Sequence, residues 1–472
     1  MTVAETPYVI AIVGAGPSGI YAAEALIQQA EVPLEVVVID RLPVPFGLVR
    51  YGVAPDHESI RSIRNTLERT LERPEVRFYG DVSIGSDLKI EELRDVVDAV
   101  IYAYGAGSDR RLGIEGEDLR GSIAAPEFVA WYCGHPDVHP DLEQPGGDGH
   151  LVATDIDELI STASQAVVVG VGNVALDVAR VLIKSAPELI ETDMPDDVLE
   201  SHGHKGIREV HILGRRGPAY TSFTTKELRE LGQLPDVDVV MAVDDLDLDE
   251  SSRAVVARDK VAARNVAVMR EWADRKPTGA GKRIYLHFWT RPMRILGSAR
   301  VAAVQVERTA INTDGYVVGV GDTRDIPAQL VVRAVGYRGR PLAGVPYDES
   351  TGRVPHAEGR VIRDHSFSAD EYVTGWIKRG PTGVIGTNKS DAVETVTSLL
   401  ADIHDGALVA HGRSGDLDRL LAERGISPLG MPAWHRIDAA EIELGRSRGR
   451  RRTTLAHRQE LLAAAEDDHQ PA

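Results

Sequence analysis

The sequence predicts an α/β protein with two doubly wound, parallel-sheet domains, one of them inserted into the other. Two apolar, β-branched runs are each followed by a glycine turn and then by apolar residues at helical spacing. A hydrophobic strand followed by a glycine occurs within residues 101–105 and again within residues 331–337, on either side of the second run. We therefore expect one domain to comprise residues 1–108 and 331–472, and the inserted domain to comprise residues 109–330.

The first apolar run, residues 9–13, leads into the turn GAGPSG at residues 14–19. Gly14 permits a sharp turn, and Gly16 lets backbone N–H groups approach a pyrophosphate. Gly19 lets the following helix pack closely on the strand. The N-terminus of that helix would then face the phosphates.

A second strand follows this helix at residues 34–39 and ends in Asp40. The spacing between the first glycine and Asp40 is close to that expected for an acid that binds the ribose of a dinucleotide, which is about 20 residues. Strand, glycines, helix, strand and acid in this order predict a Rossmann-like dinucleotide-binding site. The alternative is a glycine turn in an ordinary βαβ unit.

The second apolar run opens the same pattern, with Gly170 and Gly172 in the turn and Ala175 at the third position. Two such folds in one chain predict two dinucleotides. The next strand ends not in an acid but in Arg215 and Arg216. An acid would select a free 2′-hydroxyl, whereas paired guanidinium groups hold a 2′-phosphate. The sequence therefore predicts NADP here; an empty duplicated fold or unliganded arginines are the alternatives.

Other elements follow from apolar periodicity and turn residues. The proline- and glycine-rich stretch at residues 41–57 is expected to be a shaped loop that carries function, because loops at the carboxyl ends of parallel strands bind ligands. Asp56 is expected to cap a helix with an apolar stripe. The remaining expected elements are strands at residues 76–78, 82–84, 283–288, 300–308, 316–320 and 329–334, helices at 226–232 and 258–276, and short charged helices after 415.

Composition limits the possible functions. The chain has 472 residues, 43% of them hydrophobic, which is enough for a large core. Its single cysteine, Cys133, excludes an internal disulfide, a dithiol redox pair and a cysteine-held iron–sulfur cluster, and we expect an inert core thiol. A net charge of −19 argues against general nucleic-acid binding, although residues 446–452 form a basic run. Without a leader or an apolar run of membrane-spanning length, we expect a cytoplasmic protein.

The motifs GAGPSG, PFGLVRYGVAPDH, GNVALDVAR, GRRGP and GWIKRGPTGVIGTNK occur in this order. Together they resemble the adrenodoxin-reductase-like family of ferredoxin–NADP reductases, over roughly residues 9–403. The resemblance implies FAD on the N-terminal domain, NADP(H) on the inserted domain, and an iron–sulfur ferredoxin as electron partner. We expect no metal site in the chain itself.

The resemblance also implies individual site residues. For FAD they are Gly14, Ala15, Gly16, Gly19, Asp40, Leu48, Val82, Trp376, Gly383, Val384 and Ile385. For NADP they are Arg110, Gly172, Asn173, Val174, Ala175, Leu176, Arg215, Arg216 and Glu227, with Gly383 against the nicotinamide. His57 and Glu227 match the polar pair that the family places near the reacting centre, so they are the candidate catalytic residues. A histidine that only caps a helix is the alternative for His57.

The chain departs from the family's pattern at two places. Asp40 stands where the family usually has a glutamate, so the ribose contact would be shorter or mediated by water. Residues 219–222, Ala-Tyr-Thr-Ser, replace a Leu-Gln pair expected after GRRGP, which affects the pose of NADP.

The expected activity is transfer of a hydride from NADPH to FAD and then of single electrons to a ferredoxin. A flavin monooxygenase or another flavoprotein diaphorase is the alternative, and a non-enzymatic dinucleotide sensor is a further one. Ferredoxins are usually acidic, so an encounter needs a local positive face, for which we expect Arg264 and Arg270, with residues 446–452 as the second candidate. We expect a monomer or weak dimer that binds neither nucleic acid nor membrane.

Overall fold

The computed structural model describes residues 6–139 and 152–466, and the chain divides into two compact units. The first lies within Met1–Ser108 and Tyr337–Ala472, and the second is Asp109–Gly336. The chain leaves the first unit at β5 (Ser108–Asp109) and returns at β15 (Tyr337–Arg338), and these two strands pair. The return falls at Tyr337 rather than at residue 331, because β14 (Leu330–Arg333) is an inner strand of the second unit's sheet.

The first unit is built on a seven-stranded sheet in the order β16-β17-β18-β4-β1-β2-β3. Five neighbouring strands, from β18 to β3, run parallel, and β17 and β16 add an antiparallel edge. The inner strands read as nearly continuous apolar runs because helices cover both faces. The strands are β1 (Tyr8–Val13), β2 (Leu34–Ile39), β3 (Val76–Tyr79), β4 (Ala99–Tyr102), β16 (His356–Ala357), β17 (Arg360–Arg363) and β18 (Ser366–Val373).

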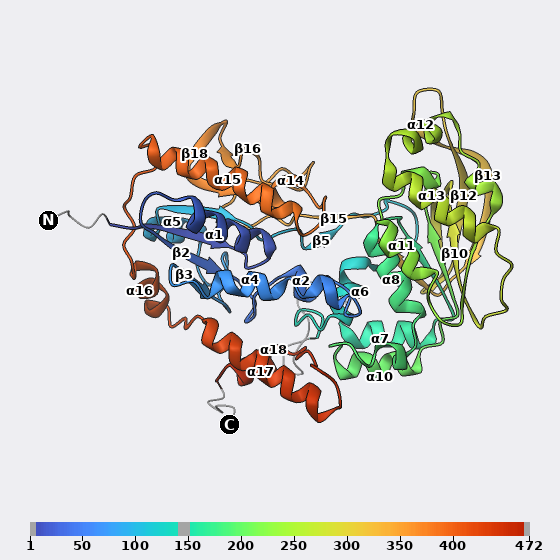
Figure 1. Ribbon diagram of the computed structural model, residues 1–472, viewed down its shortest axis with the longest axis horizontal. Coiled ribbons are helices and arrows are strands. Elements are labelled where there is room, and N and C mark those ends of the chain that lie inside the picture. The colour runs from blue at the N-terminus through green and yellow to red at the C-terminus, as the bar shows by residue number, and fades with distance from the viewer. Residues whose placement is uncertain (1–5, 140–151, 467–472) are drawn as a thin grey trace. The chain divides into compact units, whose positions relative to one another are not determined.

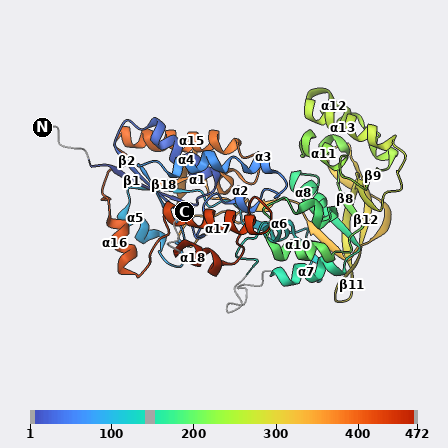
Figure 2. The same cartoon turned by 60° about the horizontal axis from the view of Figure 1, so that its bottom comes forward.

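Helices α1 and α15 lie side by side on one face of this sheet (Figure 1). On the other face α5 and α16 pack Leu93 and Leu417 against the strands, and α17 contacts α18 (Figure 2). The helices of this unit are α1 (Pro17–Gln29), α2 (Leu48–Tyr51), α3 (Glu58–Arg61), α4 (Arg64–Leu71), α5 (Ile90–Val96), α14 (Trp376–Arg379), α15 (Thr387–His404), α16 (Asp416–Glu423), α17 (Met431–Ser447) and α18 (Arg458–Glu466).

The second unit has a six-stranded sheet in the order β6-β14-β7-β8-β10-β9, with neighbouring strands parallel. The antiparallel sheet β11-β12-β13 packs on one face, where Val304 and Val306 join the cluster of Val167 and Val169, and α8 packs on the other. The strands are β6 (Ser122–Ala124), β7 (Gln165–Val169), β8 (Glu209–Leu213), β9 (Val237–Met241), β10 (Lys282–His287), β11 (Thr290–Gly297), β12 (Val301–Ile311), β13 (Val317–Pro327) and β14.

The helices of the second unit follow the strands in the alternation typical of α/β folds. They are α6 (Ala125–Tyr132), α7 (Ala153–Thr162), α8 (Asn173–Ile183), α9 (Ala186–Leu189), α10 (Asp196–His204), α11 (Thr225–Leu231), α12 (Glu250–Arg258) and α13 (Lys260–Ala273), with 3₁₀ turns η1 (Pro218–Tyr220) and η2 (Val243–Leu246). The predicted α/β fold class with parallel sheets is confirmed.

Three local predictions are wrong, and a fourth needs its bounds corrected. Residues 82–84 form no strand, because Asp81 adopts a positive φ of 64° that turns the chain. The helix predicted at 258–276 is confirmed as α13, which begins at Lys260 because Asp259 is extended and its carboxylate caps the helix, and α12 before it was not predicted. His57 rather than Asp56 is the N-cap of α3, and α4 begins separately. The loop at 41–57 contains one helical turn, α2.

Two compositional expectations concern the whole chain. Cys133 is buried, as expected for a core thiol. Among the described residues, the helices are too short or too polar for any of them to cross a membrane. The expected cytoplasmic location stays a prediction.

Gly19 provides a test of how tightly α1 packs on β1. A Cβ at Gly19 would lie 2.0 Å from the carbonyl oxygen of Gly14, whereas a Cβ at Gly203 in α10 would meet nothing within 4 Å. Gly19→Ala should lower the free energy of unfolding by about 1–3 kcal/mol or more, as overpacking does. Gly203→Ala should leave it unchanged or raise it by about 0.5–1 kcal/mol. Urea unfolding of both variants measures this, and equal midpoints would contradict the close approach.

Candidate dinucleotide-binding sites

The turn between β1 and α1 admits only glycine at its first position. Gly14 has a φ of 113°, and a Cβ there would lie 2.6 Å from the carbonyl oxygen of Ala103, just after β4. Gly16 is the N-cap of α1, and a Cβ there would meet only the Cα of Gly47, at 3.9 Å. The protein therefore leaves space in front of the helix N-terminus, where a phosphate could approach the backbone N–H groups.

Asp40, the acid after β2, holds this turn in place. Its Oδ2 accepts a hydrogen bond from the backbone N–H of Ala15 at 2.7 Å, and its Oδ1 accepts one from the N–H of Leu42 at 3.0 Å. Each carboxylate oxygen has a second acceptor position. The carboxylate thus orders the turn itself, and its contact with a ribose stays a prediction.

The loop after β2 lies against the same turn. The N–H of Phe46 donates to the carbonyl of Ala15 at 2.8 Å, and the N–H of Val82 donates to the carbonyl of Asp40 at 3.0 Å. Leu48 is half-buried at the start of α2, whereas Val82 is buried. The structure therefore brings the candidate FAD residues from three separate segments to one end of the sheet.

The segment after β18 reaches this end of the sheet too. Ser18 in α1 donates to Asn388 Oδ1 in α15 at 2.9 Å, which joins the N-terminal turns of the two helices. Gly383 has a φ of 83°, and Val384 is 61% exposed. Trp376 is half-buried against Tyr337, with ring centroids 5.3 Å apart. Ile385 is also half-buried, so this segment offers apolar surface on which a planar ring could pack.

The turn between β7 and α8 repeats the geometry in the second unit. Gly170 has a φ of 138°, and a Cβ there would lie 2.2 Å from the carbonyl oxygen of Ala334. Gly172 is the N-cap of α8. Asn173 Oδ1 accepts from the N–H of Thr224 at 2.8 Å, so the candidate ligand residue also holds the start of α11.

The other candidate residues of this turn differ in exposure. Ala175 and Leu176 are fully buried on the core side of α8, so their side chains contact the core, and only their backbone could face a ligand. Val174 is half-buried. Arg110 is exposed, and its N–H donates to the carbonyl of Gly336 at 3.0 Å in the paired crossing segments.

The two arginines after β8 are exposed side chains on a firmly held backbone. The Arg215 carbonyl accepts from Thr309 Oγ1 at 2.8 Å, and the Arg216 carbonyl accepts from the N–H of Trp289 at 3.2 Å. The Arg216 guanidinium lies 5.3 Å from the ring centroid of Tyr220. Sequence reasoning missed Tyr220, although it lies in the stretch 219–222 that departs from the family's pattern.

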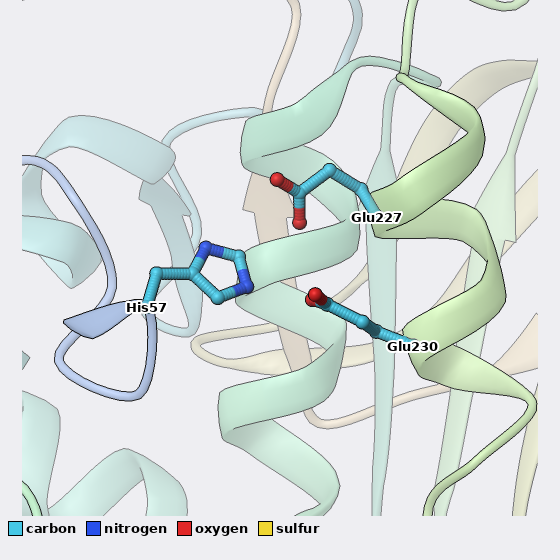
Figure 3. A group of neighbouring side chains, drawn as sticks. All are labelled: His57, Glu227 and Glu230. Carbon is cyan, nitrogen blue, oxygen red and sulfur yellow. The ribbon is translucent and has the colours of Figure 1, made fainter. Parts of the chain in front are cut away.

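Glu227 belongs to a buried charge cluster within the second unit. It projects from α11, as does Glu230 (Figure 3), and it is 4% exposed. Arg180 of α8 is 2% exposed, and its Nη1 lies 3.8 Å from an oxygen of each glutamate and 2.8 Å from Asp177 Oδ1. Sequence reasoning missed Arg180 and Glu230; Arg180 ends the motif GNVALDVAR, of which only residues 172–176 were assigned to the site.

His57 lies in the first unit at the start of α3 (Figure 3) and is 6% exposed. It occupies the N-cap position, but its side chain makes no capping hydrogen bond. The interpretation of His57 as merely a local cap therefore fails. Its catalytic role stays a prediction.

The fold and the two turns define a class of protein. Each unit presents a helix N-terminus behind a glycine turn at the carboxyl end of a parallel sheet, the arrangement that binds dinucleotides. The chain is thus an α/β protein with two dinucleotide-binding domains.

Comparison with known proteins identifies the family of the chain. Residues 8–234 match the family described as pyridine nucleotide-disulphide oxidoreductase. The chain is 44% identical to NADPH-ferredoxin reductase FprA of Mycobacterium tuberculosis over 97% of this chain and 98% of that protein. It is 36% identical to the mitochondrial NADPH:adrenodoxin oxidoreductase of Arabidopsis thaliana, over 97% and 95% of the two chains.

A solved structure of Mycobacterium tuberculosis FprA in complex with NADPH is similar to this one with a TM-score of 0.89 and 43% identity, covering 98% of this chain and 100% of that one. The chain belongs to the family of NADPH-ferredoxin reductases that includes FprA and the adrenodoxin oxidoreductases. The resemblance inferred from the motifs is confirmed.

Proposed function

We propose that this protein is an FAD-dependent NADPH–ferredoxin reductase, which passes a hydride from NADPH to FAD and single electrons from FAD to a ferredoxin. The observation that carries the proposal is the contrast between two equivalent turns. The first is followed by Asp40, and the second by the exposed Arg215 and Arg216. Family membership supports the same assignment, because the relatives named above are an NADPH-ferredoxin reductase and an NADPH:adrenodoxin oxidoreductase.

The first unit fits FAD. The open space at Gly16 suits a pyrophosphate, and Asp40 lies where an adenosine ribose would be bound. Leu48, Trp376 and the exposed Val384 offer apolar surface for the flavin ring. Bound FAD would supply the conversion between a hydride and single electrons, which no side chain of the protein can perform.

The second unit fits NADPH. Gly172 leaves the N-terminus of α8 open to the pyrophosphate, since a Cβ there would meet only Ser222 Oγ, at 3.7 Å. Arg215 and Arg216 would hold the 2′-phosphate, and the Tyr220 ring would orient the Arg216 guanidinium. We propose contacts from Arg110 and from the backbone of residues 172–176 on the same basis.

A ferredoxin would dock on the exposed side of α13. Arg264 and Arg270 are exposed on this helix, whereas Val266 and Met269 face the core. The net charge of −19 repels an acidic partner at long range, so a local positive face is required within a Debye length of about 8–10 Å.

Purified protein tests the proposal directly. It should be yellow, with one FAD per chain, and it should oxidise NADPH when a ferredoxin is supplied as the one-electron acceptor. A flavin monooxygenase would instead consume oxygen and an organic substrate. Protein that takes up no FAD, or that reduces no ferredoxin from a panel, would contradict the proposal.

The arginine pair should determine nicotinamide choice. In the double variant Arg215→Ala/Arg216→Ala the backbone contacts of the turn remain, so only the phosphate contacts are lost. Each charge-assisted contact is worth about 1.5–3 kcal/mol. The apparent Michaelis constant for NADPH should therefore rise by one to several orders of magnitude, and that for NADH should hardly change.

Arg300, which is exposed and pairs with Glu158, provides the control for this prediction. Arg300→Ala should leave both Michaelis constants unchanged, because exposed ion pairs contribute little. Equal use of NADPH and NADH by the unaltered protein would contradict the assignment of the arginines.

His57 and Glu227 are proposed to assist hydride transfer. His57→Gln and Glu227→Gln should each slow reduction of the flavin by NADPH by about tenfold or more, as loss of a positioned polar group does, without expelling FAD. Stopped-flow absorbance measures the rate, and the flavin-to-protein ratio measures retention. Unchanged rates of flavin reduction in both variants would mean that these residues have only a structural role.

Charge reversal on α13 tests the docking face. Arg264→Glu/Arg270→Glu should slow ferredoxin reduction at low salt and should weaken its dependence on ionic strength, because steering acts through exposed charge. Reduction of a small neutral acceptor should be unaffected. Glu271→Lys, an exposed acid on the same helix, should act in the opposite direction. Normal ferredoxin reduction by the double variant would place the docking face elsewhere.

A further inference from the structure

Helix α17 carries a carboxylate into the interior of the first unit. Glu441 is fully buried, with 0% exposure. Arg50 of α2 donates to it from Nη1 at 3.1 Å and also from Nη2. Arg452 donates from Nε at 3.2 Å, and the backbone N–H of Leu455 donates at 2.9 Å. Both oxygens of this buried carboxylate are therefore hydrogen-bonded.

The charges around Glu441 are also buried. Arg50 and Arg452 are each 6% exposed, and Arg452 donates from Nη1 to Asp438 Oδ1 at 2.8 Å. Burial works against ionisation of Glu441, but the two guanidinium groups outweigh it and lower the pKa of the carboxyl. Burial likewise opposes the charged form of Arg50, and Glu441 outweighs it, raising the pKa of the guanidinium. Removing the charge of Glu441 would leave Arg50 buried without its counter-charge, which is strongly unfavourable.

Arg50 lies in the loop that faces the first glycine turn. Arg61 of α3 donates from Nη2 to the Arg50 carbonyl at 2.6 Å, so α2 and α3 are tied together on either side of the segment that ends in His57. A helix of one turn, such as α2, has no stability of its own. Its position is therefore set by tertiary contacts, and its ion pair with Glu441 is a buried contact of this kind.

Helix α17 contacts the loop at a second point. The ring of Phe46 packs edge-on against Trp434, with centroids 5.3 Å apart. Phe46 has a φ of 85°, which costs free energy for a bulky side chain and persists only where surrounding contacts impose it. Directly after it, a Cβ on Gly47 would lie 3.0 Å from the Cα of Gly16. The contacts of α17 with Phe46 and Arg50 therefore lie on either side of Gly47, which meets the glycine turn.

We propose that Glu441 is a positioning residue for the flavin site: by holding Arg50 it fixes the loop from Phe46 to His57 against the glycine turn. The inference rests on the proposed function, since it takes FAD as the ligand of the first unit. In this proposal α17 helps to set the positions of Leu48 and His57.

Glu441→Gln isolates the charge from the docking of the helix. Trp434 keeps its contact with Phe46, and its Nε1 keeps its hydrogen bond to Glu68 at 2.7 Å, so α17 remains attached to α4. The matched control is Glu443→Gln, two residues along the same helix, where the side chain is 74% exposed. A third variant, Arg50→Met/Glu441→Leu, replaces the buried pair by apolar side chains, while Arg452 loses one contact but keeps Asp438 as its counter-charge.

Three measurements on the full chain test the proposal. Glu441→Gln should raise the dissociation constant for FAD at least tenfold, shift the flavin absorption band, and speed amide hydrogen exchange across residues 46–57 in the FAD-free protein. Glu443→Gln should change none of these. Arg50→Met/Glu441→Leu should recover thermal stability but should still show fast exchange and weak FAD binding, because the loop has lost its anchor.

The outcomes separate a positioning role from general stabilisation. If Arg50→Met/Glu441→Leu recovers FAD affinity and loop protection together with stability, Glu441 only stabilises the fold and the proposal is wrong. This variant tests the proposal even if Glu441→Gln does not fold. Unchanged FAD affinity and exchange in Glu441→Gln would also overturn it. If the unaltered chain takes up no FAD, the proposed function fails and the inference fails with it, which is distinguishable from failure of the inference alone.

Discussion

Close backbone approach at the two glycine turns is the constraint on which both units depend. Gly14 and Gly170 each stand against the carbonyl oxygen of the residue that follows a neighbouring strand, at distances that exclude a Cβ. Only this approach lets the chain turn sharply enough for a helix N-terminus to face the carboxyl end of the sheet. Each unit meets the constraint separately, and the result is two equivalent places for a pyrophosphate.

The two places differ in the residues that come after the strand that follows each turn and helix, β2 in the first unit and β8 in the second. In the first unit Asp40 turns its carboxylate back to the N–H of Ala15, so the acid that we propose for ribose binding also holds the turn. In the second unit backbone carbonyls, held by Thr309 and Trp289, shape the turn. The side chains of Arg215 and Arg216 are thereby left exposed, as the proposed contact with a 2′-phosphate requires.

Sequence patterns predicted the parts of the fold that depend on local chemistry. The strands beside the glycine turns, the turns themselves and the fold class follow from apolar runs and glycine spacing. Sequence patterns were insufficient where distant residues decide: the strand predicted at 329–334 forms, but its pairing with β6 and β7 puts it in the second unit rather than in the first. Arg50 and Glu441 lie far apart in the chain, and Arg180 looks like any polar residue of a helix, so no local pattern shows that these charges are buried together.

The basic run at residues 446–452 shows that a run of like charges in the sequence need not form an exposed, charged surface. Arg450 and Arg452 are each 6% exposed, and Arg452 is one of the two cations that hold Glu441. Arg451 is exposed but pairs with Glu58 at 2.5 Å. Much of the positive charge of this run therefore serves the fold or is already paired, whereas Arg264 and Arg270 project from a helix whose opposite side is buried. Since attraction of an acidic partner needs accessible charge, burial favours α13 over the C-terminal run as the docking face.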